Sequence, residues 1–123
     1  MSVSDLINVG LSDQANEKLD DLKERGIFAD KIDGYRFGVS LALARGAIGG
    51  DLVDRKNLFN VGSLDPDQLI KTAVEALHAD LLKENTVYRL VERLADWGVN
   101  ELHAQAVTGN IDFDRILAQT LAD

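Results

Sequence analysis

The 123-residue sequence contains no cysteine and no long apolar run. Without cysteine the chain has no disulfide framework, no thiolate zinc site and no cysteine nucleophile, which is typical of a protein in a reducing cytoplasm. No apolar stretch approaches the ~20 residues of a membrane-spanning helix. Residues 1–5 also lack the basic and apolar regions of a secretion signal. We therefore expect a cytoplasmic protein with no membrane association.

Basic residues are scarce. The chain has 13 Lys and Arg against 21 Asp and Glu, a formal net charge of -8. This charge disfavours nonspecific attraction to nucleic acid or to anionic membranes. Residues 1–62 carry 8 basic and 10 acidic side chains, whereas residues 63–123 carry 5 and 11. Any polyanion contact is thus expected in the first half. The second half is either a solvated acidic surface or a docking surface for a basic protein partner.

Catalytic and metal-binding patterns are sparse. Glu75 and His78 have the Glu-x-x-His spacing of di-iron helical bundles, but the second such motif is missing, and the other histidine, His103, has no matching ligand spacing. The glycines between 46 and 62 match no phosphate-binding pattern. Ser40 has no histidine nearby in the sequence. We expect no catalytic residue, no bound metal and no cofactor.

Hydrophobic periodicity predicts a single, mainly α-helical domain of about six helices. Alternation of Ile7, Val9 and Leu11 predicts a short strand over 6–11, or an extended lead-in. Ser12 is a natural N-cap for a helix over 13–25, which Gly26 ends, and a second helix spans 31–45. Residues 47–62 show no helical period, which predicts a connecting loop.

The second half is predicted to be a helical extension over 63–123. Asp65 as N-cap and Pro66 at the first helical position begin a helix that should end near 84–85. Thr86 caps a helix over 87–97, which Gly98 should end. Shorter helices are expected over 100–108 and 113–122. The domain would thus comprise a strand-helix-helix unit (1–46), a loop (47–62) and this extension.

Small residues recur every four positions in the helix over 31–45, at Gly34, Gly38, Ala42 and Gly46. Each glycine inside a helix costs about 0.5–1 kcal/mol relative to alanine, so the stripe predicts a close approach by another backbone. Charged neighbours exclude a membrane span. We expect either a dimer or tetramer assembled through Gly34, Gly38 and Ala42, or a contact with another helix of the same chain.

Three segments of the first half resemble a known family: LSDQA (11–15), LDDLKERGI (19–27) and RFGVSLAL (36–43). Together they resemble the small helical subunit of bacterial DNA phosphorothioation systems, called DndE. More broadly they resemble ribbon-helix-helix repressors, in which paired strands from two chains enter the DNA major groove. The resemblance covers about residues 9 to 45.

The resemblance implies a non-enzymatic, oligomeric subunit of a DNA-modification or anti-phage defence complex that contacts DNA through Lys23, Arg25 and Arg36. Arg55 and Lys56, the only adjacent basic pair, are a further candidate contact or a solvated loop tip. The chain departs from the family in three ways. Acidic residues flank the candidate basic contacts, the predicted strand has no basic residue, and residues 63–123 form an extension that the resemblance does not cover. Arg36 has an alternative role as the partner of a carboxylate such as Asp33.

Three functions therefore remain open. The first is the DNA-complex subunit, which predicts a homo-oligomer and salt-sensitive DNA binding. The second is an acidic protein-protein interaction adaptor that does not bind nucleic acid. The third is a small enzyme whose site is completed across a subunit interface.

Overall fold

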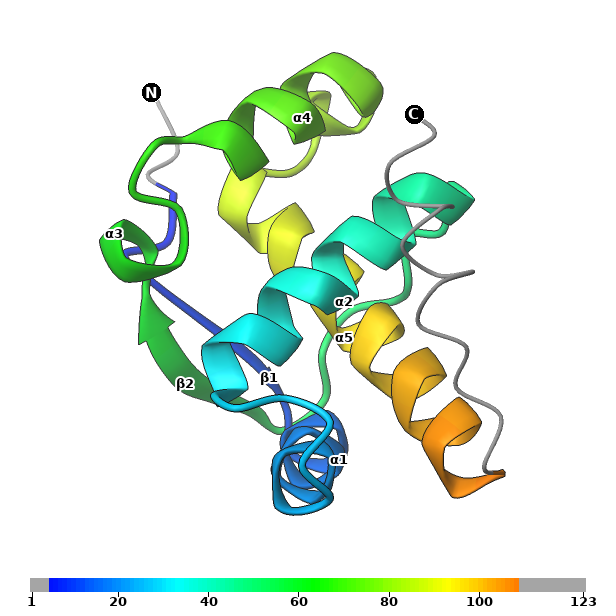
Figure 1. The fold of residues 1–123 in the computed structure, drawn as a ribbon. Coiled ribbons are helices and arrows are strands. Elements are labelled where there is room, and N and C mark those ends of the chain that lie inside the picture. Colours follow the sequence, from blue (N-terminus) through cyan, green and yellow to red (C-terminus); the bar gives the residue numbers. More distant parts are fainter. Residues whose placement is uncertain (1–4, 109–123) are drawn as a thin grey trace.

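The computed structural model describes residues 5–108, and these form a mainly helical fold with one small sheet (Figure 1). The elements in chain order are β1 (Asn8–Ser12), α1 (Asp13–Glu24), α2 (Lys31–Arg45), β2 (Arg55–Asn60), α3 (Val61–Leu64), α4 (Leu69–Leu77), the short 3-10 helix η1 (Leu81–Lys83) and α5 (Val87–Val107). The predicted mainly helical class is confirmed. The described part contains five α-helices rather than the expected six, and the helix predicted over 113–122 lies outside the described residues.

Helix α5 is the centre of the fold. It packs against α2, α1, β1 and α4, and Figure 1 shows it crossing α2. Fully buried side chains of α1, α2, β1 and α5 make one hydrophobic core, which includes Leu11, Leu19, Tyr35, Leu41, Leu90, Leu94 and Leu102. The helical extension therefore shares its core with the strand-helix-helix unit.

Local capping signals place the first two helices as predicted. Ser12 is the N-cap of α1, and its hydroxyl accepts a hydrogen bond from the Ala15 N–H at 3.2 Å. Gly46 follows α2 in the left-handed conformation, with φ of 66°. The Ser12 and Gly46 caps each act within one helical turn, so the sequence alone predicts them.

The loop predicted over 47–62 is wrong in part, because β2 occupies Arg55–Asn60. It pairs antiparallel with β1, which confirms the predicted strand with a shift of a residue or two. Val9 lies opposite Phe59 and Leu11 opposite Lys56, and the register is irregular between Val9 and Gly10. The sequence RKNLFN shows no clear alternation, so its pairing depends on the tertiary contact with β1.

Gly98 does not end a helix, and the predicted break between 97 and 100 is wrong. Helix α5 runs unbroken for 21 residues. Gly98 sits where α5 meets α2, and a Cβ built on it would overlap the carbonyl group of Gly38. The glycine is therefore a close-packing position in a helix interior, a role that local sequence does not distinguish from a stop.

The boundaries of α4 also differ from the prediction. The helix begins at Leu69 rather than beside Pro66, because Gln68 adopts a left-handed conformation with φ of 56°. Asp65 still caps it from a distance, since its two carboxylate oxygens accept the N–H groups of Ile70 and Lys71, each at 3.0 Å. The helix ends at Leu77, and η1 replaces the predicted continuation to 84–85.

Candidate functional site

The small-residue stripe of α2 makes its close contacts inside the chain. A Cβ on Gly38 would lie 3.2 Å from both the Ala95 oxygen and the Val99 nitrogen of α5. Ala42 is fully buried, and a Cβ on Gly34 would meet the Leu19 side chain at 2.6 Å. The stripe predicts a close contact either with a second copy of the chain or with another helix of the same chain. The structure shows the contact within the same chain. Assembly of copies through this stripe stays a prediction.

Two of the predicted DNA contacts, Arg25 and Arg36, have partners within the chain. The Arg25 guanidinium donates to the Asp21 carboxylate at 2.7 Å, one turn earlier on α1. Arg36 donates to the carbonyl oxygens of Ser63 at 2.7 Å and Leu64 at 3.0 Å, and its charge lies 3.6 Å from Asp33. Arg36 therefore ties α2 to α3, close to the alternative role expected for it.

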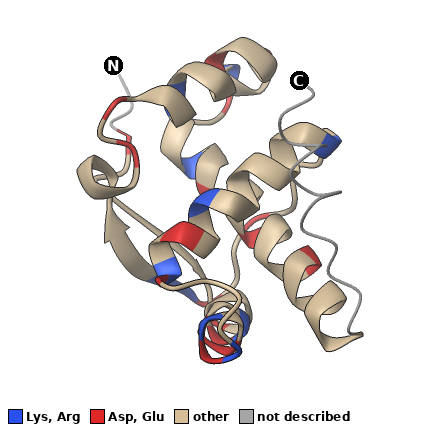
Figure 2. Cartoon of the chain, viewed as in Figure 1, with Lys and Arg blue, Asp and Glu red and all other residues tan. Residues whose placement is uncertain are grey.

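Arg55 and Lys56, the basic pair on β2, also have partners within the chain. Arg55 donates to Glu92 of α5 at 2.6 Å and to the Asn8 carbonyl at 2.9 Å, while Lys56 pairs with Asp13 at 2.9 Å. Lys23 is exposed, and no described residue pairs with it. Figure 2 shows acidic and basic residues side by side on α1. Four of the five predicted contacts are thus neutralised or hydrogen-bonded internally.

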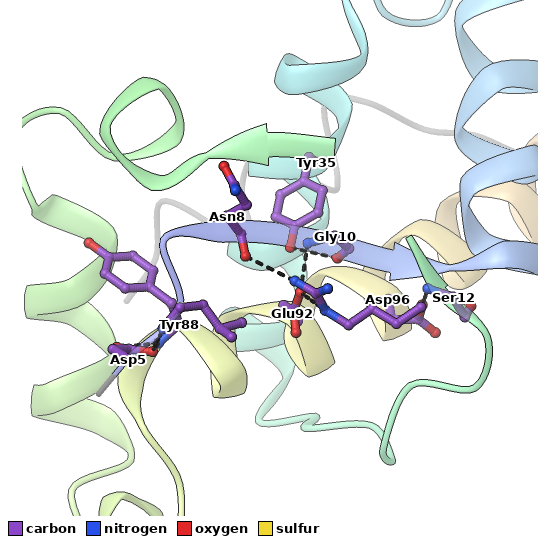
Figure 3. Close-up of polar contacts among 10 residues, drawn as sticks. Asp5, Asn8, Gly10, Ser12, Tyr35, Tyr88, Glu92 and Asp96 are labelled. Carbon is purple, nitrogen blue, oxygen red and sulfur yellow. Dashed lines mark hydrogen bonds and ion pairs between the residues drawn. The ribbon is translucent and has the colours of Figure 1, made fainter. Parts of the chain in front are cut away.

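Carboxylates of α5 cover the outer edge of β1 (Figure 3). Glu92 accepts the Gly10 N–H at 2.7 Å, and Asp96 accepts the Ser12 N–H at 2.8 Å. The two acids are four residues apart on a helix, and the two N–H groups are two residues apart on a strand, so the spacings match. Since β2 occupies the other edge, both edges of β1 are hydrogen-bonded within the chain.

Glu92 is only 4 % exposed, and its environment shifts its pKa upward. Burial raises the pKa of the carboxyl group, and the hydrogen bonds from Gly10 and Arg55 counteract part of that rise. The Tyr35 hydroxyl donates to the Gly10 carbonyl at 2.9 Å, and burial raises the pKa of Tyr35 well above its usual value. This network fixes β1 onto α5 and α2, a structural role.

His103 has a carboxylate partner, whereas the buried Nε2 of His78 has no hydrogen-bond partner among the described residues. His103 on α5 lies 2.8 Å from the Asp21 carboxylate, and hydrogen bonds from Arg25 and His103 lower the pKa of Asp21. His78 follows the end of α4. Residues 5–108 contain no group of three or more ligating side chains placed to hold a metal ion.

The outer face of α4 is apolar and exposed. Leu69 and Leu77 are 70 % and 55 % exposed, and Ala76 between them is also exposed. Ala76 and Leu77 follow Leu69 by seven and eight residues, which is helical spacing, whereas Val74, three residues before Leu77, is fully buried. Only the packing of α4 on α5 decides which of its apolar side chains are buried.

Acidic residues flank this face at both ends of α4. Asp67 lies just before the helix and Asp80 just after it, and both are exposed. Residues 65–84 contain five acidic side chains against two lysines. We call the set Leu69, Ala76, Leu77, Asp67 and Asp80 the α4 surface. It combines apolar contact area with a negative rim, which matches an apolar partner segment with basic flanks.

A hollow of about 720 Å³ lies on another side of α4, where this helix, η1 and the beginning of α5 meet. Lys71, Lys83 and Arg89 line it, together with Glu75 and Glu84. Sequence patterns missed this set because the three basic residues come from three different elements.

Comparison with known proteins identified no relative. No protein-family model, curated protein or solved structure matches the chain. No helix within residues 5–108 has the length and apolar character needed to cross a membrane.

Proposed function

We propose that this protein is a non-enzymatic, acidic interaction adaptor that binds a basic, amphipathic segment of a partner protein at the α4 surface. The observation that carries the proposal is the pair of exposed leucines, Leu69 and Leu77, on one face of α4 between Asp67 and Asp80. An amphipathic partner helix binds by placing its own apolar face against exposed apolar side chains of the receptor.

The charge distribution supports a protein partner over direct DNA contact. DNA binding derives much of its free energy from basic side chains that displace counterions from phosphates. Arg25, Arg55 and Lys56 already face carboxylates at 2.6–2.9 Å, so binding phosphate would first require breaking these pairs. Their carboxylate partners would also repel the DNA backbone.

A role in a DNA-modification or anti-phage complex is a second proposal, and it rests on the resemblance of residues 9 to 45. Among the five predicted DNA contacts, the exposed Lys23 is the feature that favours it. In that case the chain would bind duplex DNA at low salt and release it as salt rises. Homo-oligomer formation and a cytoplasmic location likewise stay predictions.

The test uses a model peptide of leucine and lysine that forms an amphipathic helix, with binding followed by fluorescence anisotropy. Replacing Leu69 and Leu77 together by serine should weaken binding at least tenfold, because each leucine loses about 1 kcal/mol or more of burial. Val53 and Val107 are matched controls, since they are 71 % and 58 % exposed outside α4. Their replacement by serine should leave binding unchanged.

Two outcomes would contradict the adaptor. Equal binding by the leucine and valine variants would show that charge alone attracts the peptide. Salt-sensitive binding of a short DNA duplex that is lost in Lys23→Ala would favour the second proposal instead.

A further inference from the structure

The three basic residues in the hollow beside α4 form no side-chain hydrogen bond or ion pair with described residues, although the charge of Arg89 favours the ionised form of Glu92. Within residues 5–108 the basic side chains that form no hydrogen bond or ion pair are Lys23, Lys71, Lys83 and Arg89. Three of these four line the same hollow. By contrast, Arg25, Arg55 and Lys56 pair with carboxylates.

From this grouping we propose that the hollow binds a small phosphorylated metabolite, with the phosphate held by Lys71, Lys83 and Arg89. Its volume of about 720 Å³ lies within the range of roughly 300–1,000 Å³ of small-molecule sites. The three residues come from α4, η1 and α5, and all three line the same hollow. Ammonium and guanidinium groups are the usual ligands of phosphate oxygens.

The rest of the lining suits the non-phosphate part of such a ligand. Glu75 and Glu84 provide acceptors for hydroxyl or amino groups, and Leu82 and Val87 provide apolar contact. Thr86 also lines the hollow, and its hydroxyl oxygen is buried with no hydrogen-bond partner among the described residues.

The site does not depend on the N-terminus of α5. The Asp5 carboxylate already accepts the Tyr88 N–H at 3.0 Å, so the first turn of α5 is occupied by an internal anion. Asp5 lines the hollow too, which places a negative charge beside the ligand. The phosphate must therefore be held by side chains, and their removal should abolish binding.

The experiment measures binding of ADP by isothermal titration calorimetry at low salt, with adenosine and inorganic phosphate as comparison ligands. The full chain should bind ADP more tightly than phosphate and should not bind adenosine. Replacing Lys83 and Arg89 together by alanine should weaken ADP binding at least tenfold. Lys23→Ala is the matched control, because Lys23 is equally unpartnered but lies on α1, away from the hollow.

Retention of ADP affinity in the Lys83 and Arg89 double variant, or an equal loss in Lys23→Ala, would overturn the site. So would the lack of heat from ADP at millimolar concentration. Circular dichroism of each variant establishes that it is folded. Leu69→Ser with Leu77→Ser should leave ADP binding intact, which separates this site from the α4 surface.

Discussion

Gly38 of α2 and Gly98 of α5 lie in direct backbone contact where the two helices cross. A Cβ on Gly98 would overlap the Gly38 carbonyl group, and one on Gly38 would lie 3.2 Å from the Val99 nitrogen. The contact brings two long helices closer than any pair of larger side chains would permit. It also explains why glycine is found inside both helices despite its conformational cost.

Gly98→Ala should therefore destabilise the fold, by about 1–3 kcal/mol, although alanine is normally favoured over glycine in a helix. The added methyl group can be placed only by separating α2 from α5. Urea unfolding followed by circular dichroism measures the change. Gly50→Ala is the control, because no atom lies within 4 Å of its Cβ position, and its effect should stay within about 0.5 kcal/mol.

Gly38→Leu tests whether the small-residue stripe of α2 packs on α5 of the same chain or on a second copy. Its side chain would collide with the α5 backbone around Ala95 and Val99, so we expect loss of the cooperative unfolding transition or a large fall in its midpoint. Light scattering gives the molecular mass of the same sample. A lower mass than the unsubstituted protein, with unchanged thermal stability, would instead place this stripe at a contact between copies.

The buried carboxyl of Glu92 should titrate above its ordinary pKa of 4.5, because burial raises that pKa. Between 4.5 and the raised value the folded state holds more protons than the unfolded state. The contribution of Glu92 to the free energy of unfolding therefore falls as pH rises through this interval. Carboxyl chemical shifts in an NMR titration measure the pKa directly.

Arg55→Ala should raise the pKa of Glu92 further, since the guanidinium stabilises the ionised carboxylate at 2.6 Å. Lys56→Ala is the matched control on the same strand, and its partner is Asp13. A Glu92 pKa at or below 4.5 in the unsubstituted protein would contradict the burial argument.

Replacing Asp65 by alanine should destabilise the fold far more than replacing Asp67, although the two residues are only two positions apart. Asp65 is 5 % exposed and accepts the Tyr88 hydroxyl at 2.9 Å as well as two N–H groups at the start of α4. Asp65→Ala should cost about 2–3 kcal/mol, because buried donors lose a charged acceptor. Asp67→Ala, at an exposed position, should change stability by less than about 0.5 kcal/mol.

Thermal unfolding of the Asp65→Ala and Asp67→Ala variants in the same buffer compares their stabilities. Tyr88→Phe removes one donor of this cluster and should cost about 1 kcal/mol. Equal stability of Asp65→Ala and Asp67→Ala would show that Asp65 does not fix α4 onto α5.

The basic residues illustrate what sequence reasoning could and could not find in the candidate sites. Arg36 was expected either on DNA or beside a carboxylate such as Asp33, and the structure places it against Asp33 and the α3 carbonyls. Lys71, Lys83 and Arg89 come from three different elements and follow no regular spacing, so no spacing rule groups them. Their common hollow is formed only when α4 and η1 pack at the beginning of α5.

The sequence by itself determined the helical class and the limits of α1 and α2, because capping by Ser12 and Gly46 acts within one turn. Tertiary structure alone decided that Gly98 lies inside a helix, that residues 55–60 form a strand, and that Leu69 remains exposed. These outcomes depend on which surfaces meet across the chain. Burial and hydrogen bonding between distant segments supply that information, and local propensity does not.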